Sequence, residues 1–155
     1  MNTPKDLRPG DVLLYAPSDL LGVAIAIKCW TWLSHVECCI GNGQVIAARI
    51  QGVDIYRERI DEYLVCVRRP FKQFNLVGAI AAVKPMMFQK YEVSGLFEFF
   101  APLRHKAHAT RICSSVATVF LRGGGVEPFN PNVAPEDVAP AQLYQTAELN
   151  TVWTR

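Results

Sequence analysis

Three residues of the sequence could together carry out nucleophilic catalysis: His35, Glu37 and Cys113. His35 begins a segment with strand-forming character, HVECCI, and Glu37 lies two residues further on. Residues i and i+2 of a strand point to the same face, so the imidazole and the carboxylate are predicted to be neighbours. Such a carboxylate can orient the imidazole and favour its charged form. The alternative is a core or edge histidine with an incidental glutamate.

Cys113 lies near the start of a predicted helix, in the segment RICSSVATVFLRGGG. Thr110 is a suitable N-cap, which would make Cys113 the third helical residue. The partial positive charge of a helix N-terminus favours a thiolate there. A thiolate, a strand histidine and its carboxylate form a Cys-His-acid site that can attack a carbonyl and form a thioester. A cysteine alone is more often structural, and the pairing with His35 favours the catalytic interpretation.

The other histidines and cysteines give no second site. His105 and His108 lie in the basic segment RHKAHA, which is predicted to be an exposed loop. Cys38 and Cys39 are adjacent in a strand and must face opposite ways, so they cannot easily bind one metal ion. No CxxC pair, HExxH motif or phosphate-binding loop occurs in the sequence, so neither a metal nor another cofactor is predicted.

Composition limits the class of protein. The 155 residues correspond to one domain, 1–155, and half of them are hydrophobic, which is typical of a globular chain. A net charge of +2 gives no electrostatic reason to expect a nucleic-acid partner. No apolar run approaches the ~20 residues that span a bilayer, and no secretory signal is visible. The five cysteines, an odd number, suit a reducing compartment. We therefore expect a cytoplasmic or virion-associated protein.

The elements that must position these residues follow from periodicity and turn residues. The segment Gly41-Asn42-Gly43 predicts a tight hairpin turn, because Asn and Gly tolerate positive φ. Strands are predicted over 11–15, 35–40, 44–49, 52–56, 64–67 and 151–155, and helices over 19–30, 74–83, 93–100, 110–122 and within 134–145. This order predicts an α+β fold in which an antiparallel sheet or small barrel packs with helices.

The motifs GDVLLY, SHVECCIGNGQVIAA, GVDIY and CSSVA together resemble the NlpC-type papain-like cysteine peptidases. In most of that family the Cys helix precedes the His strand, whereas here His35 precedes Cys113 by 78 positions. This order resembles the circularly permuted branch, which includes YiiX-like proteins and lecithin:retinol acyltransferase-like enzymes. The resemblance extends from about Leu7 to Leu143 and implies a single permuted papain-like domain.

The resemblance implies a role for each matching residue. Cys113 would be the nucleophile and His35 the general base, with the backbone N–H of Cys113 as the default oxyanion donor. Many relatives carry a third polar residue twelve positions after the histidine, but this chain has Ala47 there. Glu37 is the best replacement, since some permuted relatives carry HxE. Tyr15 and Ser114 match places that line the substrate cleft.

The function implied by the resemblance is a cysteine hydrolase, a peptidase or amidase, acting through a thioester acyl-enzyme on cell-wall peptidoglycan peptides. Two alternatives remain. One is a lipid amidase or acyltransferase of the same fold, which an exposed apolar subset among Trp30, Trp32 and Leu33 would favour. The other is a catalytically degenerate binding module in a phage or secretion assembly, which the departure at Ala47 favours.

Overall fold

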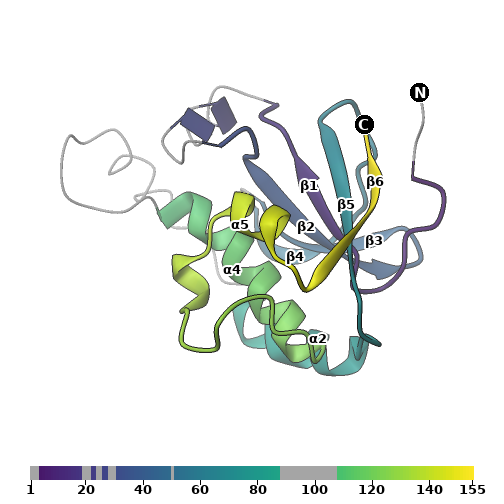
Figure 1. The fold of residues 1–155 in the computed structure, drawn as a ribbon, viewed down its shortest axis with the longest axis vertical. Coiled ribbons are helices and arrows are strands. Elements are labelled where there is room, and N and C mark those ends of the chain that lie inside the picture. Colours follow the sequence, from purple (N-terminus) through teal and green to yellow (C-terminus); the bar gives the residue numbers. More distant parts are fainter. Residues whose placement is uncertain (1–3, 19–21, 24–25, 28–30, 50, 88–107) are drawn as a thin grey trace.

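The chain folds into a mixed α/β structure in which one antiparallel sheet carries helices on one face (Figure 1). The computed structural model describes residues 4–18, 22–23, 26–27, 31–49, 51–87 and 108–155, and only the backbone of 108–112. The described strands are β1 (Val12–Tyr15), β2 (His35–Gly41), β3 (Gln44–Arg49), β4 (Gly52–Arg57), β5 (Leu64–Pro70) and β6 (Leu149–Thr154). They form a six-stranded sheet in the order β4-β3-β2-β1-β5-β6.

Strand β1 lies in the middle of the sheet and pairs with both β2 and β5. Its four residues, VLLY, are all buried, because both faces of the sheet are covered at this point. A strand buried on both faces reads as a continuous apolar run rather than an alternating one. The opening segment therefore becomes the central strand, and it carries Tyr15 at its end, directly opposite His35.

A tight hairpin joins β2 to β3, as the sequence predicts. Gly41, Asn42 and Gly43 all have positive φ, at 94°, 54° and 71°. Glycine and asparagine adopt this left-handed conformation at the least cost, which is why the turn forms here. The hairpin fixes the register of the two strands and places Ala47 opposite Glu37.

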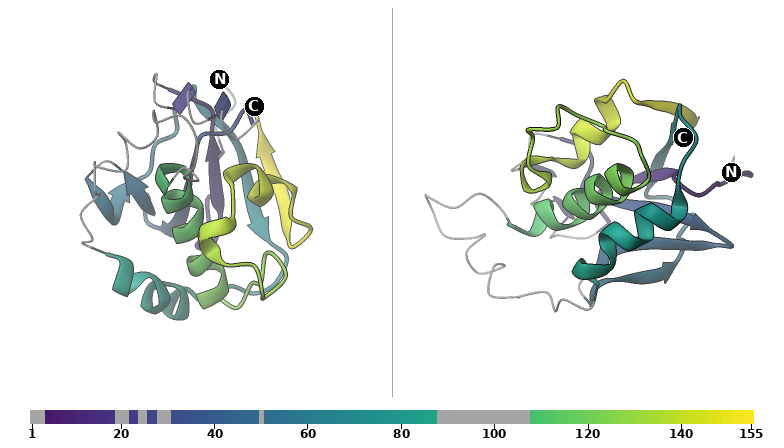
Figure 2. Two further views of the ribbon diagram at one scale, coloured as in Figure 1. Left: turned by 90° about the vertical axis from the view of Figure 1, so that its left-hand side faces the viewer. Right: turned by 90° about the horizontal axis from the view of Figure 1, so that it is seen from below.

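Three α-helices occur among the described residues: α2 (Leu76–Val83), α4 (His108–Gly123) and α5 (Pro140–Gln145), with 3-10 turns η1 (Lys84–Met86) and η2 (Pro135–Asp137). Asn75 caps α2 by accepting a hydrogen bond from the Gly78 N–H at 3.1 Å. Helices α2 and α4 pack closely because glycines meet: a Cβ at Gly78 would lie 2.5 Å from the Gly123 carbonyl oxygen. Figure 2 shows this pair beside the sheet.

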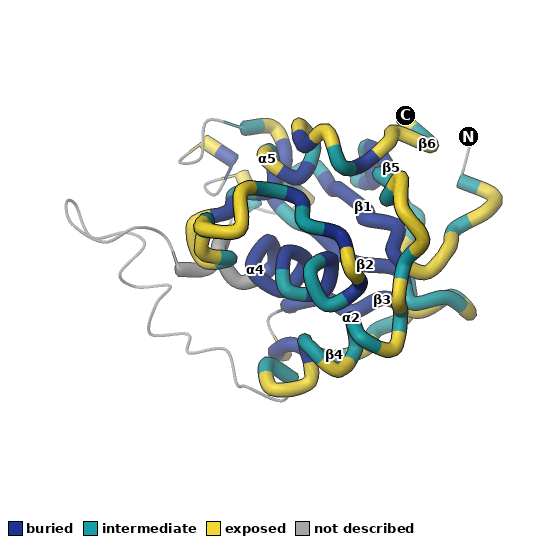
Figure 3. The backbone as a smooth tube through the Cα atoms, turned by 60° about the horizontal axis from the view of Figure 1, so that its bottom comes forward, coloured by how far each residue is buried: buried dark blue, intermediate teal, exposed yellow. Residues whose placement is uncertain are grey.

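The hydrophobic core has two parts, one on each face of the sheet. The larger part lies between the sheet and the helices, and α4 contributes Val116, Ala117, Phe120 and Leu121 to it. The smaller part lies on the opposite face and includes Leu13, Tyr15 and Cys39. Figure 3 shows α4 and the central strands as the most deeply buried backbone. Cys38 and Cys39 belong to different clusters, as the strand alternation predicts.

The predicted strands and the hairpin are confirmed, and β6 lies at the edge of the sheet. One helix boundary is wrong. Thr110 lies inside α4, which is helical from His108, so it is not the N-cap of that helix. The pair His108-Ala109 is compatible with helix, and a local cap residue does not override such continuation. The predicted helix over 93–100 lies outside the described residues, and that over 19–30 is described only at 22–23 and 26–27, which are helical.

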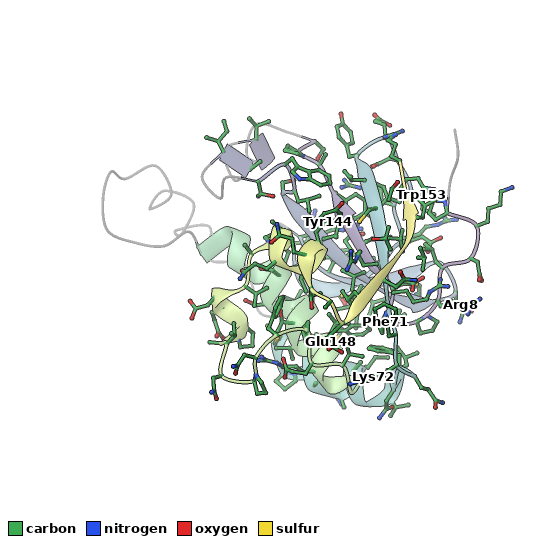
Figure 4. The ribbon with its side chains drawn as sticks, in the orientation of Figure 1. Arg8, Phe71, Lys72, Tyr144, Glu148 and Trp153 are labelled. Atoms are coloured by element: carbon green, nitrogen blue, oxygen red, sulfur yellow. The ribbon has the colours of Figure 1, made fainter. Side chains whose placement is uncertain are left out.

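A buried ion pair between Asp11 and Arg69 holds the segment that precedes β1 against β5. The Asp11 side chain has no exposed surface, and Arg69 donates to both of its oxygens at 2.7 Å. The backbone N–H of Arg8 also donates to Asp11, at 2.8 Å. The side chain of Arg8, by contrast, is 62% exposed and lies at the margin of the molecule in Figure 4.

Among the described helices, none is long and apolar enough to cross a bilayer.

Candidate active site

His35 and Glu37 lie side by side at the start of β2, as the strand alternation predicts. Nε2 of His35 lies 3.2 Å from Oε1 of Glu37. The His35 side chain keeps 22% of its surface exposed, whereas the Glu37 side chain has none. The imidazole is therefore the outer member of the pair, and the carboxylate supports it from inside the protein.

Cys113 lies on α4 at the site of His35, and it is 5% exposed. A side-chain hydrogen bond links the thiol to the imidazole. Because Nε2 of His35 faces Glu37, Nδ1 is the ring nitrogen left for the sulfur. Burial by itself lowers the pKa of His35, but the hydrogen bonds with Cys113 and Glu37 outweigh it and raise that pKa to about 9. The site therefore favours a protonated imidazole beside the sulfur.

Glu37, which lies on β2, connects the site to the neighbouring strands β1 and β3. Its Oε2 lies 3.1 Å from the Tyr15 hydroxyl on β1, and its Oε1 accepts from Nε and Nη2 of Arg49 on β3, at 3.0 and 2.8 Å. Burial raises the pKa of Glu37, but the hydrogen bond from His35 and the nearby charges of His35 and Arg49 hold it below its usual value. The carboxylate is thus kept ionised in a buried position.

Position 47, where many of the enzymes that the sequence resembles carry a third polar residue, is Ala47 in this chain, and the polar contact to the site comes from Arg49 instead. Ala47 pairs with Glu37 across the β2–β3 ladder. Arg49 lies two residues further along β3 and so points to the same face, where it reaches Glu37. Sequence reasoning missed Arg49. The same i+2 rule that joined His35 to Glu37, applied from Ala47, is the signal that could have found it.

The two residues expected to line a cleft are both fully buried. Tyr15 is 0% exposed, and its hydroxyl lies within hydrogen-bond distance of Glu37 and of the Arg59 carbonyl oxygen. Burial and the Glu37 charge raise the pKa of Tyr15 well above its usual range, so its hydroxyl stays protonated. Ser114 is also 0% exposed and donates to the Val138 carbonyl oxygen. In this structure both side chains support the site from within.

The helix boundary changes the argument for the Cys113 thiolate. With α4 helical from His108, Cys113 is at least the sixth helical residue instead of the third. The helix-terminus effect falls off within the first turn, so it gives little support to a thiolate at this position. At that position of a regular α-helix the Cys113 N–H bonds to the carbonyl four residues earlier. This geometry gives no support to the Cys113 N–H as the oxyanion donor.

The structure describes only part of the other cysteines and histidines. Cys66 is buried, and burial raises its pKa to about 11. Among the described residues, no group of three or more His, Cys, Asp or Glu side chains could hold a metal ion. His105 and Cys29 lie outside the described residues, as does the side chain of His108.

The raised pKa of His35 predicts a loss of stability in mildly alkaline solution. The folded protein holds the His35 proton to about pH 9, whereas the unfolded chain releases it near pH 6.5. The stabilisation is therefore present below pH 6.5 and is lost as the pH rises through 9. Urea unfolding at pH 6 and pH 9.5 should show this fall, and His35→Ala should reduce it. An equal fall in both proteins would contradict the assignment to His35.

The described side chains thus bring together a thiol, an imidazole and a buried carboxylate from α4 and β2. Such a set can generate a nucleophile and move its proton to a leaving group. No protein-family model matches the chain, and no curated protein matches it.

Proposed function

We propose that this protein is a cysteine hydrolase, a peptidase or amidase, in which Cys113 attacks a carbonyl carbon and His35 acts as its general base. The observation that carries the proposal is that His35 is hydrogen-bonded to both the Cys113 thiol and the Glu37 carboxylate. These are the two contacts that a base needs in order to take a proton and stay oriented.

The reaction proceeds in two steps. The Cys113 sulfur forms a thioester with the acyl part of the substrate, and the leaving amine or alkoxide takes the proton held by His35. His35 then removes a proton from water, which attacks the thioester and releases the acid together with the thiol. Glu37 keeps Nε2 of His35 occupied, so that Nδ1 faces the sulfur throughout.

The substrate class that we propose first is the peptide part of cell-wall peptidoglycan, in keeping with the resemblance to circularly permuted NlpC-type papain-like enzymes. A lipid amidase or acyltransferase is the second candidate. It is favoured by exposed apolar side chains in the segment that leads to His35, where Val23, Ile27 and Trp32 are 44%, 70% and 51% exposed. An acyl chain would bury such a surface, whereas a polar peptide would gain little from it.

The proposal is tested by the pH dependence of Cys113 alkylation with iodoacetamide, read by peptide mass spectrometry. Selective labelling of Cys113 at pH ~6 is expected, because a thiolate paired with an imidazolium persists well below the ordinary thiol pKa of ~8.5. His35→Ala should move the labelling to the range of an ordinary thiol.

Three buried thiols serve as internal controls in the same sample: Cys38, Cys39 and Cys66. Burial raises the pKa of each, to about 11 for Cys39, so none should be labelled at pH ~6. A wild-type Cys113 that reacts only as an ordinary thiol would overturn the hydrolase proposal and favour the binding module.

A further inference from the structure

Arg49 bonds directly to Glu37 of the candidate site, and it shares its target atom with His35. Its Nε and Nη2 donate to Oε1 of Glu37 at 3.0 and 2.8 Å, and the same oxygen lies 3.2 Å from Nε2 of His35. The guanidinium is held in turn. It lies 4.4 Å from the centre of the Tyr56 ring, and Nη2 also donates to the Arg57 carbonyl oxygen. Arg49 is therefore held in place against Glu37.

Arg49 compensates the buried negative charge of Glu37, which His35 alone cannot do at every pH. The Glu37 side chain has no exposed surface, so its negative charge requires a cation beside it. His35 is a cation only while it holds its second proton, whereas the guanidinium is charged at every working pH. Without Arg49, each proton released by His35 would leave a buried carboxylate with only a neutral imidazole and the Tyr15 hydroxyl. The imidazole would then hold its proton too strongly to pass it on.

We propose that Arg49 is a positioning residue of this site, which acts through Glu37 to set the pH range in which His35 exchanges its proton. The inference deepens the proposed function and rests on it. It assigns the place of the third polar residue, absent at Ala47, to a cation that supports Glu37 from β3.

The other charged and titratable groups near Glu37 come from every element packed against it. They are Tyr15 on β1, Cys38 on β2, Cys113 on α4, Tyr56 and Asp54 on β4, and the ion pair of Arg59 with Asp61 that follows β4. Arg59 lies 5.1 Å from the centre of the Tyr15 ring, and its Nε lies 2.9 Å from Asp61. Of the two arginines, only Arg49 bonds to Glu37, so Arg59 provides a matched control.

The first experiment follows His35 by 15N NMR in a Cys113→Ala background, where no thiol titrates beside it. Arg49→Gln removes the charge but keeps an amide donor. Removing a positive charge makes every nearby proton harder to lose, so the His35 titration should move to higher pH by about one unit. Arg49→Lys should keep most of the wild-type titration, and Arg59→Gln should change it much less than Arg49→Gln. An unchanged titration in Arg49→Gln would overturn the inference.

A second comparison tests whether Arg49 acts on His35 through Glu37. In a Glu37→Gln background, Arg49→Gln should shift the His35 titration far less than it does with Glu37 present. A shift of equal size would show a direct effect on His35 and would overturn the positioning role. The double variant of this second comparison leaves no unpaired buried charge, because it removes the cation and the anion together.

Alkylation of Cys113 separates this inference from the proposed function. In Arg49→Gln the acidic limb of the Cys113 alkylation profile should also move to higher pH, so the rate measured on that limb should fall. A wild-type protein without a reactive thiolate would contradict the proposed function, while the His35 titration would still measure the effect of Arg49. A reactive wild type with an unchanged Arg49→Gln variant would contradict only the inference.

Discussion

Replacement of Cys113 by alanine should abolish the burst of p-nitrophenol that the wild-type protein releases from p-nitrophenyl acetate. The burst is expected because an activated ester acylates a thiolate faster than water resolves the thioester. Without the sulfur no acyl-enzyme can form, and the remaining site offers only an imidazole to the ester. The measurement is stopped-flow absorbance, with intact mass spectrometry of the quenched protein to detect the acyl group.

Two comparisons make this result specific. Cys39→Ala removes a buried thiol that belongs to a different core cluster from Cys113, so the burst should remain. Cys113→Ala should still unfold cooperatively in urea, since the His35–Glu37–Arg49 contacts stay in place, and should lose only the part of the His35 stabilisation that the thiol supplies. A burst of normal amplitude in Cys113→Ala would contradict the assignment of the nucleophile.

Replacement of Arg69 by methionine should cost about 3–5 kcal/mol of unfolding free energy, the usual effect of leaving a buried charge without its partner. The Asp11 carboxylate is fully buried, and Arg69 supplies a hydrogen bond to each of its oxygens. In Arg69→Met only the Arg8 backbone N–H remains of these donors. Because small domains have about 5–15 kcal/mol in total, the loss should be large in urea denaturation.

The chain offers a matched control for this prediction. Arg8→Ala removes an exposed guanidinium but keeps the backbone N–H that binds Asp11, so its unfolding midpoint should stay near that of the wild type. The double variant Asp11→Asn/Arg69→Met removes both charges and should recover part of the loss. Equal stability of Arg69→Met and the wild type would show that the Asp11–Arg69 pair contributes nothing net.

The local part of the fold was accessible from the sequence. The run VLLY predicts a buried strand, and Gly41-Asn42-Gly43 predicts the hairpin, since these properties depend on neighbouring residues alone. The contact of His35 with Glu37 belongs to the same class, because a period of two places both side chains on one face. Strand positions, the hairpin and this pair therefore follow from the sequence by itself.

The tertiary structure decided the rest of the site. The β2–β3 hairpin register places Arg49 on the face of Glu37, but only the assembled sheet buries Glu37 so completely that this cation is required. Tyr15 is a buried partner of Glu37 because β1 is the central strand, a fact of strand order that no local pattern encodes. Cys113 comes to His35 only when α4 packs on the sheet, since hydrophobic burial and not sequence distance brings those two segments together.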